Sequence, residues 1–103
     1  MTDTVMRDVA LAFVRVHLLH HAAAGPVFGL EMIEELRHHG YALSPGTLYP
    51  ILHGLERSGY LKSSAETTNG RQRRYYRATA RGRRALASLK SKLAELVDEV
   101  LEG

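Results

Sequence analysis

The arginines of the second half of the chain are the residues whose grouping most directly suggests a chemistry. Seven of the 14 lysines and arginines lie between residues 71 and 84, with no acidic residue among them. Guanidinium groups suit phosphates because their planar forks of N–H donors match phosphate oxygens. The net charge is only +3, so this local grouping, rather than the total charge, predicts a surface that faces a polyanion. A solvated face of a surface helix is the alternative interpretation.

A second group of residues lies at the start of a predicted helix and favours contact with nucleic acid. Ser44 is a good N-cap and Pro45 suits the first helical position. Side chains near the N-terminus of a helix can reach base edges when the helix lies in the major groove of DNA. The residues here are small, polar or aromatic and none is acidic: Ser44, Gly46, Thr47, Tyr49, Pro50 and His53.

The six histidines raise the question of a metal site. His17 and His21 are four residues apart, which is the spacing of a ligand pair on one helical face. No nearby third ligand is evident from the sequence. The pairs at residues 20–21 and 38–39 fall at predicted helix ends, where histidines interact favourably with the helix dipole. We therefore predict no metal and no cofactor.

The sequence also lacks the residue sets of common catalytic sites. It has no cysteine, no glycine-rich phosphate loop and no serine, histidine and acid arrangement that can be placed, so we predict that the protein is not an enzyme. No stretch approaches the roughly 20 apolar residues of a membrane span. The N-terminal charges do not follow the order of a signal peptide, and we expect a cytoplasmic protein.

Hydrophobic periodicity and turn residues predict the elements that position these groups. Leu48, Leu52 and Leu55 repeat at spacings of four and three, so they share the buried face of one helix. Asn69-Gly70 is the strongest short hairpin signal and lies between two predicted strands. The predicted helices cover about residues 5–21, 27–39, 44–59 and 80–101, and the predicted strands cover 60–66 and 74–78.

This order of elements predicts a fold that is mainly α with a small β-hairpin. Two helices joined by a short turn form a helix-turn-helix, and the hairpin after them makes a wing. Arg71, Arg73 and Arg74 lie just after the tip of that wing, within reach of phosphates or a minor groove. We expect a winged helix-turn-helix DNA-binding domain over residues 1–79, followed by a C-terminal dimerisation helix over residues 80–103.

The last predicted helix, capped by Thr79, carries a heptad seam. Its apolar residues repeat at spacings of three and four, as in helices that pair with a partner helix. A helix at the end of a small domain has little of its own domain to pack on, so a second copy of the chain is the expected cover, with help from the first helix. The seam residues are Leu86, Leu89, Leu93, Leu96 and Val100, extended by Val97 and Leu101.

Two stretches of the sequence resemble the PadR family of bacterial transcriptional regulators. These are GTLYPILHGLERSGYL at 46–61 and GRQRRYYRATARG at 70–82, and GPVFGLEMIEEL at 25–36 resembles the family's second helix. The single terminal helix resembles the smaller PadR subfamily. The resemblance implies a winged-helix homodimer that represses promoters, with Tyr49-Pro50 and the basic wing at DNA. Leu30 and Gly54 depart from the family pattern, where tyrosine and a basic or polar residue are common.

The resemblance further implies release of the repressor by small phenolic or drug-like effectors. Candidate walls for such a ligand are apolar residues of the first and last helices: Val9, Phe13, Val16, Leu89 and Leu93. Two-fold symmetry implies an inverted-repeat operator in double-stranded DNA, with half-sites one helical turn or a multiple apart. The alternative is a ligand-sensing or protein-interaction module that uses the same fold without reading DNA, because fold does not fix function.

Overall fold

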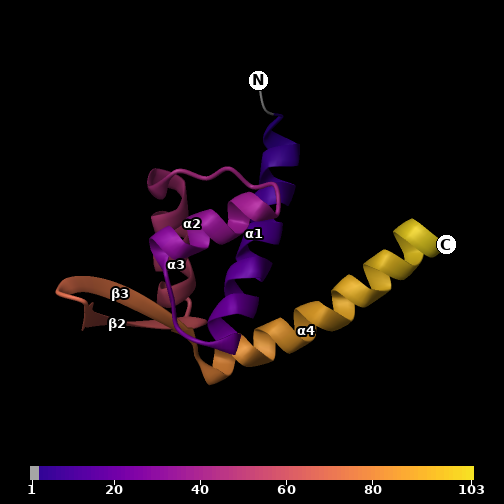
Figure 1. Cartoon of the computed structure of the whole chain (residues 1–103). Helices are drawn as coiled ribbons and strands as arrows, with labels where there is room; N and C mark the ends of the chain where they lie inside the picture. The colour runs from indigo at the N-terminus through magenta and orange to yellow at the C-terminus, as the bar shows by residue number, and fades with distance from the viewer. Residues whose placement is uncertain (1–2) are drawn as a thin grey trace.

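The computed structural model describes residues 3–103, so residues 1 and 2 of the predicted first unit lie outside it. The order is α1 (Thr4–Ala24), β1 (Val27–Phe28), α2 (Gly29–His38), α3 (Pro45–Arg57), β2 (Leu61–Thr68), β3 (Arg71–Ala78), α4 (Ala80–Val97) and a π-helical turn, η1 (Asp98–Glu102). α1 runs through the middle of the molecule, the hairpin extends to one side and α4 to the other (Figure 1).

Helix α1 is longer than the periodicity predicted, because caps at both ends extend it. The Asp3 side chain accepts a hydrogen bond from the Val5 amide at 2.8 Å. At the other end, Arg83 of α4 donates to the Ala23 carbonyl at 2.9 Å and so satisfies a group that has no partner within the helix. Val14 and Leu18 are fully buried, which places the middle of α1 against the helix-turn-helix.

Helices α2 and α3 form the predicted helix-turn-helix. Gly40 ends the first of them with a φ of 91°, a conformation that favours glycine. Ser44 is the N-cap of α3, and Pro45 is its first residue. Leu48 and Leu52 are fully buried, and each contributes about 1.5–3 kcal/mol through removal of its side chain from water. This burial turns the opposite face of α3 to solvent.

The hairpin is longer than predicted, and it belongs to a three-stranded sheet. Asn69 and Gly70 have φ values of 52° and 76° and form the two-residue tip between the paired residues Thr68 and Arg71. The predicted two-stranded hairpin is incomplete, because β1 pairs with β3 and gives the antiparallel order β1-β3-β2. Val27 and Phe28, predicted as the first helical turn, form this strand before α2 begins at Gly29.

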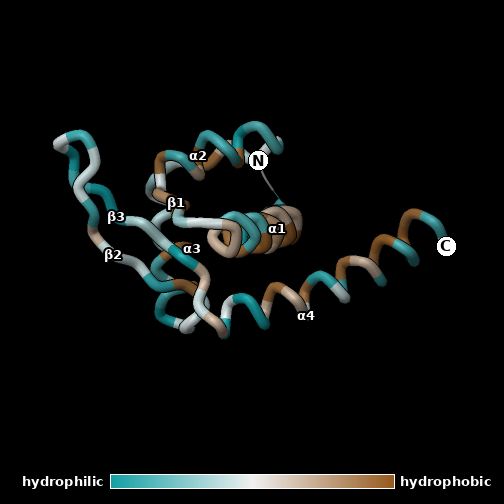
Figure 2. Tube along the Cα trace, turned by 60° about the horizontal axis from the view of Figure 1, so that its bottom comes forward, coloured by the Kyte–Doolittle hydropathy of each residue, from teal (hydrophilic) through white to brown (hydrophobic). Residues whose placement is uncertain are grey.

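Helix α4 belongs to the body of the molecule only in its first turns. The Thr79 side chain accepts a hydrogen bond from the Gly82 amide at 3.0 Å, as the predicted N-cap should. Leu86 is only 7% exposed and packs in the core of its own chain. From about residue 94 onward every residue is exposed, and this half projects from the body with hydrophobic and hydrophilic stretches in alternation (Figure 2).

Candidate nucleic-acid interface

Most of the residues of α3 that we predicted to contact DNA lie on its solvent-exposed face. Ser44, Gly46, Pro50 and His53 are exposed, and Thr47 is half-buried. The Ser44 hydroxyl caps no backbone amide and instead lies 3.4 Å from the Thr47 hydroxyl. The first turn of α3 therefore offers two hydroxyls and a helix N-terminus without an acidic residue, a combination that attracts phosphate.

Tyr49 differs from its neighbours on this face because its ring turns toward α2. It is half-buried and packs against the core. A Cβ atom at Gly29 would collide with the Tyr49 ring and hydroxyl, so the first residue of α2 must be small. Tyr49 thus fixes the distance between α2 and α3. The Tyr49 ring centroid lies 6.3 Å from that of His53. Because Tyr49 is half-buried and His53 is exposed, His53 is the ring that this face presents to solvent.

The three predicted arginines of the wing lie on two faces of β3, since side chains alternate along a strand. Arg73 shares a face with Phe28 of β1, and its guanidinium carbon lies 4.4 Å from the Phe28 ring centroid, a cation–π contact. Arg74 lies on the other face, where it donates to the Ser63 hydroxyl at 3.1 Å. Arg71 is exposed at the tip.

One carboxylate connects the wing to α3 through hydrogen bonds. Glu56, near the end of α3, accepts hydrogen bonds from the Ser63 amide at 3.0 Å and from the Ser63 hydroxyl at 2.7 Å. The same hydroxyl accepts from Arg74. A chain of contacts therefore runs from α3 through β2 to an arginine of β3, which places Arg74 on the face of the wing that adjoins α3.

A further arginine of the wing is occupied by an acidic partner. Arg77 lies 3.0 Å from the Glu66 carboxylate and 3.2 Å from the Ser64 hydroxyl. Both sides of this ion pair are about half exposed, so it contributes little to stability. The pair reduces the positive charge at the base of the wing and leaves Arg71, Arg73 and Arg74 as the cations nearer its tip.

The two tyrosines of β3, Tyr75 and Tyr76, face opposite ways because side chains alternate along a strand. Tyr75 is half-buried and meets the Phe28 ring at 5.4 Å between centroids. Tyr76 is fully buried, and its hydroxyl is the buried side-chain atom without a hydrogen-bond partner in the described part of the chain. Burial, and then the nearby charge of Glu56, raise the pKa of Tyr76. It therefore stays neutral and acts as a core residue.

Sequence reasoning missed the contribution of β1 to this site. Phe28 supplies the ring on which Arg73 rests and which Tyr75 meets. The sequence feature that could have indicated this strand is the pair Val27-Phe28, two residue types common in strands, between Pro26 and Gly29. A two-residue strand is too short for periodicity to detect, and it forms only because β3 offers a free edge.

The structure places the predicted seam of α4 in three environments. Leu86 lies in the core, so little of its surface remains for a partner, and Leu89 packs partly against that core. Leu93 is half-buried. The remaining members, together with residues of α1 that lie on the exposed surface, are large hydrophobic side chains with exposed fractions of 40–75%: Val5, Met6, Val9, Phe13, Leu96, Val97, Val100 and Leu101.

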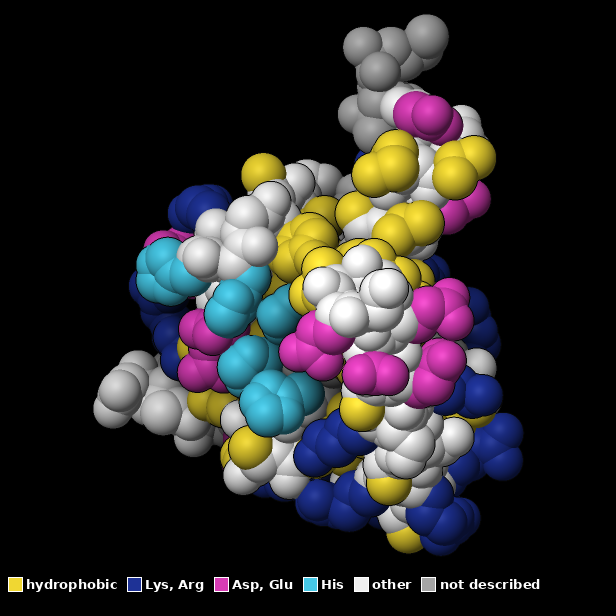
Figure 3. All heavy atoms as spheres, turned by 90° about the vertical axis from the view of Figure 1, so that its right-hand side faces the viewer, with side chains coloured by type: hydrophobic (Ala, Val, Ile, Leu, Met, Phe, Trp, Pro, Cys, Tyr) yellow, Lys and Arg dark blue, Asp and Glu magenta, His cyan; other side chains and the backbone are white. Residues whose placement is uncertain are grey.

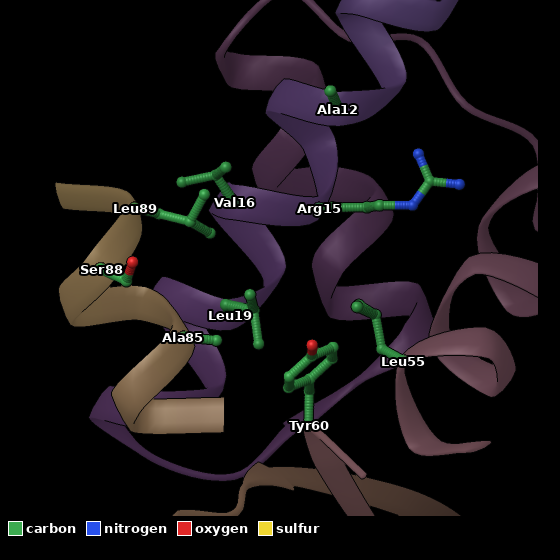
Figure 4. A pocket seen from close by; sticks show the side chains of 9 residues that line it. All are labelled: Ala12, Arg15, Val16, Leu19, Leu55, Tyr60, Ala85, Ser88 and Leu89. Atoms are coloured by element: carbon green, nitrogen blue, oxygen red, sulfur yellow. The ribbon is translucent and has the colours of Figure 1, made fainter. Parts of the chain in front are cut away.

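Four of the five predicted effector residues line two hollows between α1 and α4, and Val16 lines both. Val16 and Leu89 line one of about 540 Å³, where they face each other across the two helices with Tyr60 below (Figure 4). Phe13, Val16 and Leu93 line another of about 360 Å³. Val9 is among the lining residues of neither hollow.

The histidines are arranged differently from what the sequence suggested. The sequence indicates no third ligand near His17 and His21, but the fold brings His39 beside them, with possible ligand atoms of all three within 4.8 Å of one another. Partial burial, and then the neighbouring His39, His21 and His20, lower the pKa of His17 below its usual value. The sequence does not reveal this contact because His39 lies 18 positions after His21, and only the packing of α2 on α1 brings them together.

No helix in residues 3–103 is both long enough and apolar enough to cross a membrane. The helix-turn-helix of α2 and α3, followed by the β2–β3 hairpin as a wing, places the chain in the class of winged helix-turn-helix proteins.

Comparison with known proteins agrees with this class. Residues 18–88 match the model of the Transcriptional regulator PadR-like family. The transcriptional regulator Rv3488 of Mycobacterium tuberculosis is 52% identical over 98 residues, which cover 95% of this chain and 92% of that protein.

Solved structures support the same assignment. A PadR-like transcription factor from Bacteroides fragilis is 26% identical with a TM-score of 0.80, over 95% of this chain and 96% of that one. A PadR family transcriptional regulator from Eggerthella lenta is 28% identical with a TM-score of 0.70, over 93% and 88%. The chain belongs to the PadR-like family of transcriptional regulators. It is a regulator and not an enzyme, as predicted.

Proposed function

We propose that the chain binds a specific double-stranded DNA site as a homodimer and represses transcription by occluding a promoter. The observation that carries the proposal is the Glu56–Ser63–Arg74 chain of contacts, which sets an arginine of the wing beside the exposed face of α3. With α3 in the major groove, Thr47 and His53 face base edges, while the wing arginines face phosphates or the adjacent minor groove.

The exposed apolar side chains support the homodimer. They gather on one side of the molecule, over neighbouring parts of the surface (Figure 3). The N-terminal half of α1 contributes Val5, Val9 and Phe13, and the projecting half of α4 contributes Leu96 and Val100. Monomeric soluble proteins rarely leave such a contiguous apolar patch in water. A second copy of the chain would cover both sets at once through a two-fold interface.

This arrangement gives the two predicted units different roles. Residues up to 79 carry the helix-turn-helix and the wing, and residues 80–103 carry the dimer contacts with help from α1, while Gly82 and Leu86 join α4 to the body. Two recognition helices related by a two-fold axis fit an inverted repeat whose half-sites lie about 34–36 Å apart, or a multiple of this distance. We place the activity in the cytoplasm, where bacterial DNA lies.

We assign an effector, a small aromatic or drug-like molecule, to the hollows between α1 and α4. Their walls are mainly apolar, and both helices also carry the proposed dimer surface. A ligand wedged between Val16 and Leu89 would change the angle between the helices and so the spacing of the two recognition helices. Thermal unfolding with a panel of small aromatic compounds tests this, with Leu89→Ala expected to reduce any rise in Tm. Equal stabilisation of the wild type and the variant would contradict this assignment.

The test of DNA binding is a mobility shift with the duplex upstream of the protein's own gene. A shuffled duplex of the same length and composition is the control, and both are titrated over a range of salt concentrations. We expect the upstream duplex to bind at least about 10³-fold more tightly at physiological salt, the lower end for specific regulators. Equal affinity for both duplexes would contradict specific recognition, and no binding to either would favour an interaction module that does not read DNA.

A further inference from the structure

Three histidines that are distant in the sequence meet on one side of the molecule. His17 and His21 come from α1, and His39 is the C-cap of α2. Their possible ligand atoms lie within 4.8 Å of one another. Histidine side chains are seen gathered next to acidic ones on the face shown in Figure 3.

A carboxylate completes the cluster. One Glu35 oxygen lies 3.2 Å from Nε2 of His39 and 3.6 Å from Nε2 of His21. Glu35 precedes His39 by four residues, so both project from the same side of α2. The spacing of four also places His17 and His21 on one face of α1. Two helical pairs therefore face each other, one from each helix.

The donor set defines the kind of ligand. Imidazole nitrogens and a carboxylate oxygen suit divalent transition ions of the zinc type, whereas magnesium and calcium prefer oxygen ligands only. Zinc holds nitrogen ligands at about 2.0–2.1 Å in tetrahedral geometry, so the nitrogen atoms must approach by rotation of their side chains. They are free to do so, since the side chains of His21 and His39 are 27% and 45% exposed.

Ion pairing with Glu35 alone explains only part of this arrangement. It accounts for the positions of His21 and His39, which both approach the carboxylate. It does not account for His17, whose ring lies 4.7 Å from that of His39 and 5.5 Å from that of Tyr41. The possible ligand atoms of His17, His21 and His39 nevertheless lie within 4.8 Å of one another, so His17 adds a third imidazole to the two that approach the carboxylate.

We propose that His17, His21 and His39, with Glu35 beside them, form a binding site for a divalent transition-metal ion of the zinc type. The ion joins α1 to the end of α2, at the start of the connection of residues 39–44 that leads into α3. Metal binding therefore stabilises the position of the helix-turn-helix relative to α1. This metal site does not depend on the DNA-binding proposal and is tested by a separate experiment.

The test is calorimetric titration of tag-free, chelator-treated protein with zinc chloride alone. We expect one ion per chain, together with a rise in Tm. His17→Ala, His21→Ala and His39→Ala should each weaken binding at least about tenfold, because each removes one ligand. Circular dichroism of the metal-free variants checks that each is folded.

Two exposed histidines outside the cluster provide matched controls. His38→Ala and His53→Ala should bind zinc as the wild type does, because His38 points toward Glu34 and His53 lies on α3. The proposal is overturned if the wild type shows no saturable binding, if the three cluster variants keep the wild-type affinity, or if the control variants lose as much affinity as the cluster variants do.

Discussion

The arginines of the wing differ in the side chains that they contact. Arg73 is fixed over the Phe28 ring and Arg74 is held by the Ser63 hydroxyl, while Arg77 is bound to Glu66. Arg71 at the tip is exposed. Charge alone cannot separate these cases, because every arginine looks equivalent in the sequence. If the wing approaches a duplex as proposed, Arg71 and Arg74 are the side chains that we expect to meet phosphates.

Replacing both residues, in Arg71→Ala/Arg74→Ala, should weaken binding to every DNA sequence. Each lost phosphate contact reduces the slope of log K against log salt by roughly 1, so the double variant should lose about 2. Lys90→Ala/Lys92→Ala is the matched control, since it removes the same charge from exposed positions on α4. Fluorescence anisotropy over a salt series measures both slopes. An unchanged slope in the arginine variant would contradict the assignment of the wing.

At the scale of single elements, the junction between α3 and the wing rests on Glu56. Its carboxylate accepts two hydrogen bonds from Ser63 in a partly buried position. Because hydrogen bonds to charged groups are the strong ones, Glu56→Ala should lower the free energy of unfolding by about 1.5–3 kcal/mol. Chemical denaturation measures this loss.

Glu66→Ala is the control for that variant. It breaks the exposed pair with Arg77 within the same sheet and should cost less than about 1 kcal/mol. Equal losses in the two variants would show that Glu56 has no special role in joining α3 to β2.

The junction between α4 and the body depends on Gly82. A Cβ atom there would collide with the Tyr60 carbonyl oxygen, a backbone atom that cannot rotate away. Gly82→Ala should therefore lower the free energy of unfolding by about 1–3 kcal/mol. Gly54→Ala in α3 is the control, since its Cβ atom would meet only the end of the Arg57 side chain at 3.9 Å. That change should raise stability by up to about 1 kcal/mol. Thermal unfolding of the two variants should move in opposite directions, and a shared direction would refute the close contact.

The elements that the sequence predicted well are those with local signals. Ser44-Pro45 marked the start of α3, Thr79 the start of α4, and Asn69-Gly70 the tip of the wing. The strand β1 carried no such signal, because two residues acquire strand geometry only when β3 lies beside them. The histidine cluster was missed for the same reason, since it exists only once α2 packs on α1.

For the molecule as a whole, α4 shows how far a heptad pattern can be interpreted. The pattern predicted one apolar stripe along a helix to residue 101, but it could not indicate which part of the stripe packs within the chain, nor that a π-helical turn replaces the α-helix from Asp98. Leu86 packs in the core, whereas Leu96 and Val100 remain exposed on the projecting half. The chain measures 52 Å along its longest axis and 23 Å along its shortest, an elongated form for 103 residues. An exposed apolar stripe of this kind is typical of a surface that a partner covers.

In the proposed assembly, two copies of the chain meet through α1 and α4 and bind one DNA site together. This assembly is tested most directly by sedimentation of Leu96→Glu/Val100→Glu beside the wild type, with and without the upstream duplex. Lys92→Glu, a change at an exposed polar position of α4, is the control. The wild type and Lys92→Glu should sediment as dimers and bind as two chains per duplex. The double variant should sediment as a folded monomer with at least about tenfold weaker DNA binding, because each buried charge is costly. A wild type that binds DNA as a single chain, or a double variant that remains a dimer, would contradict the account.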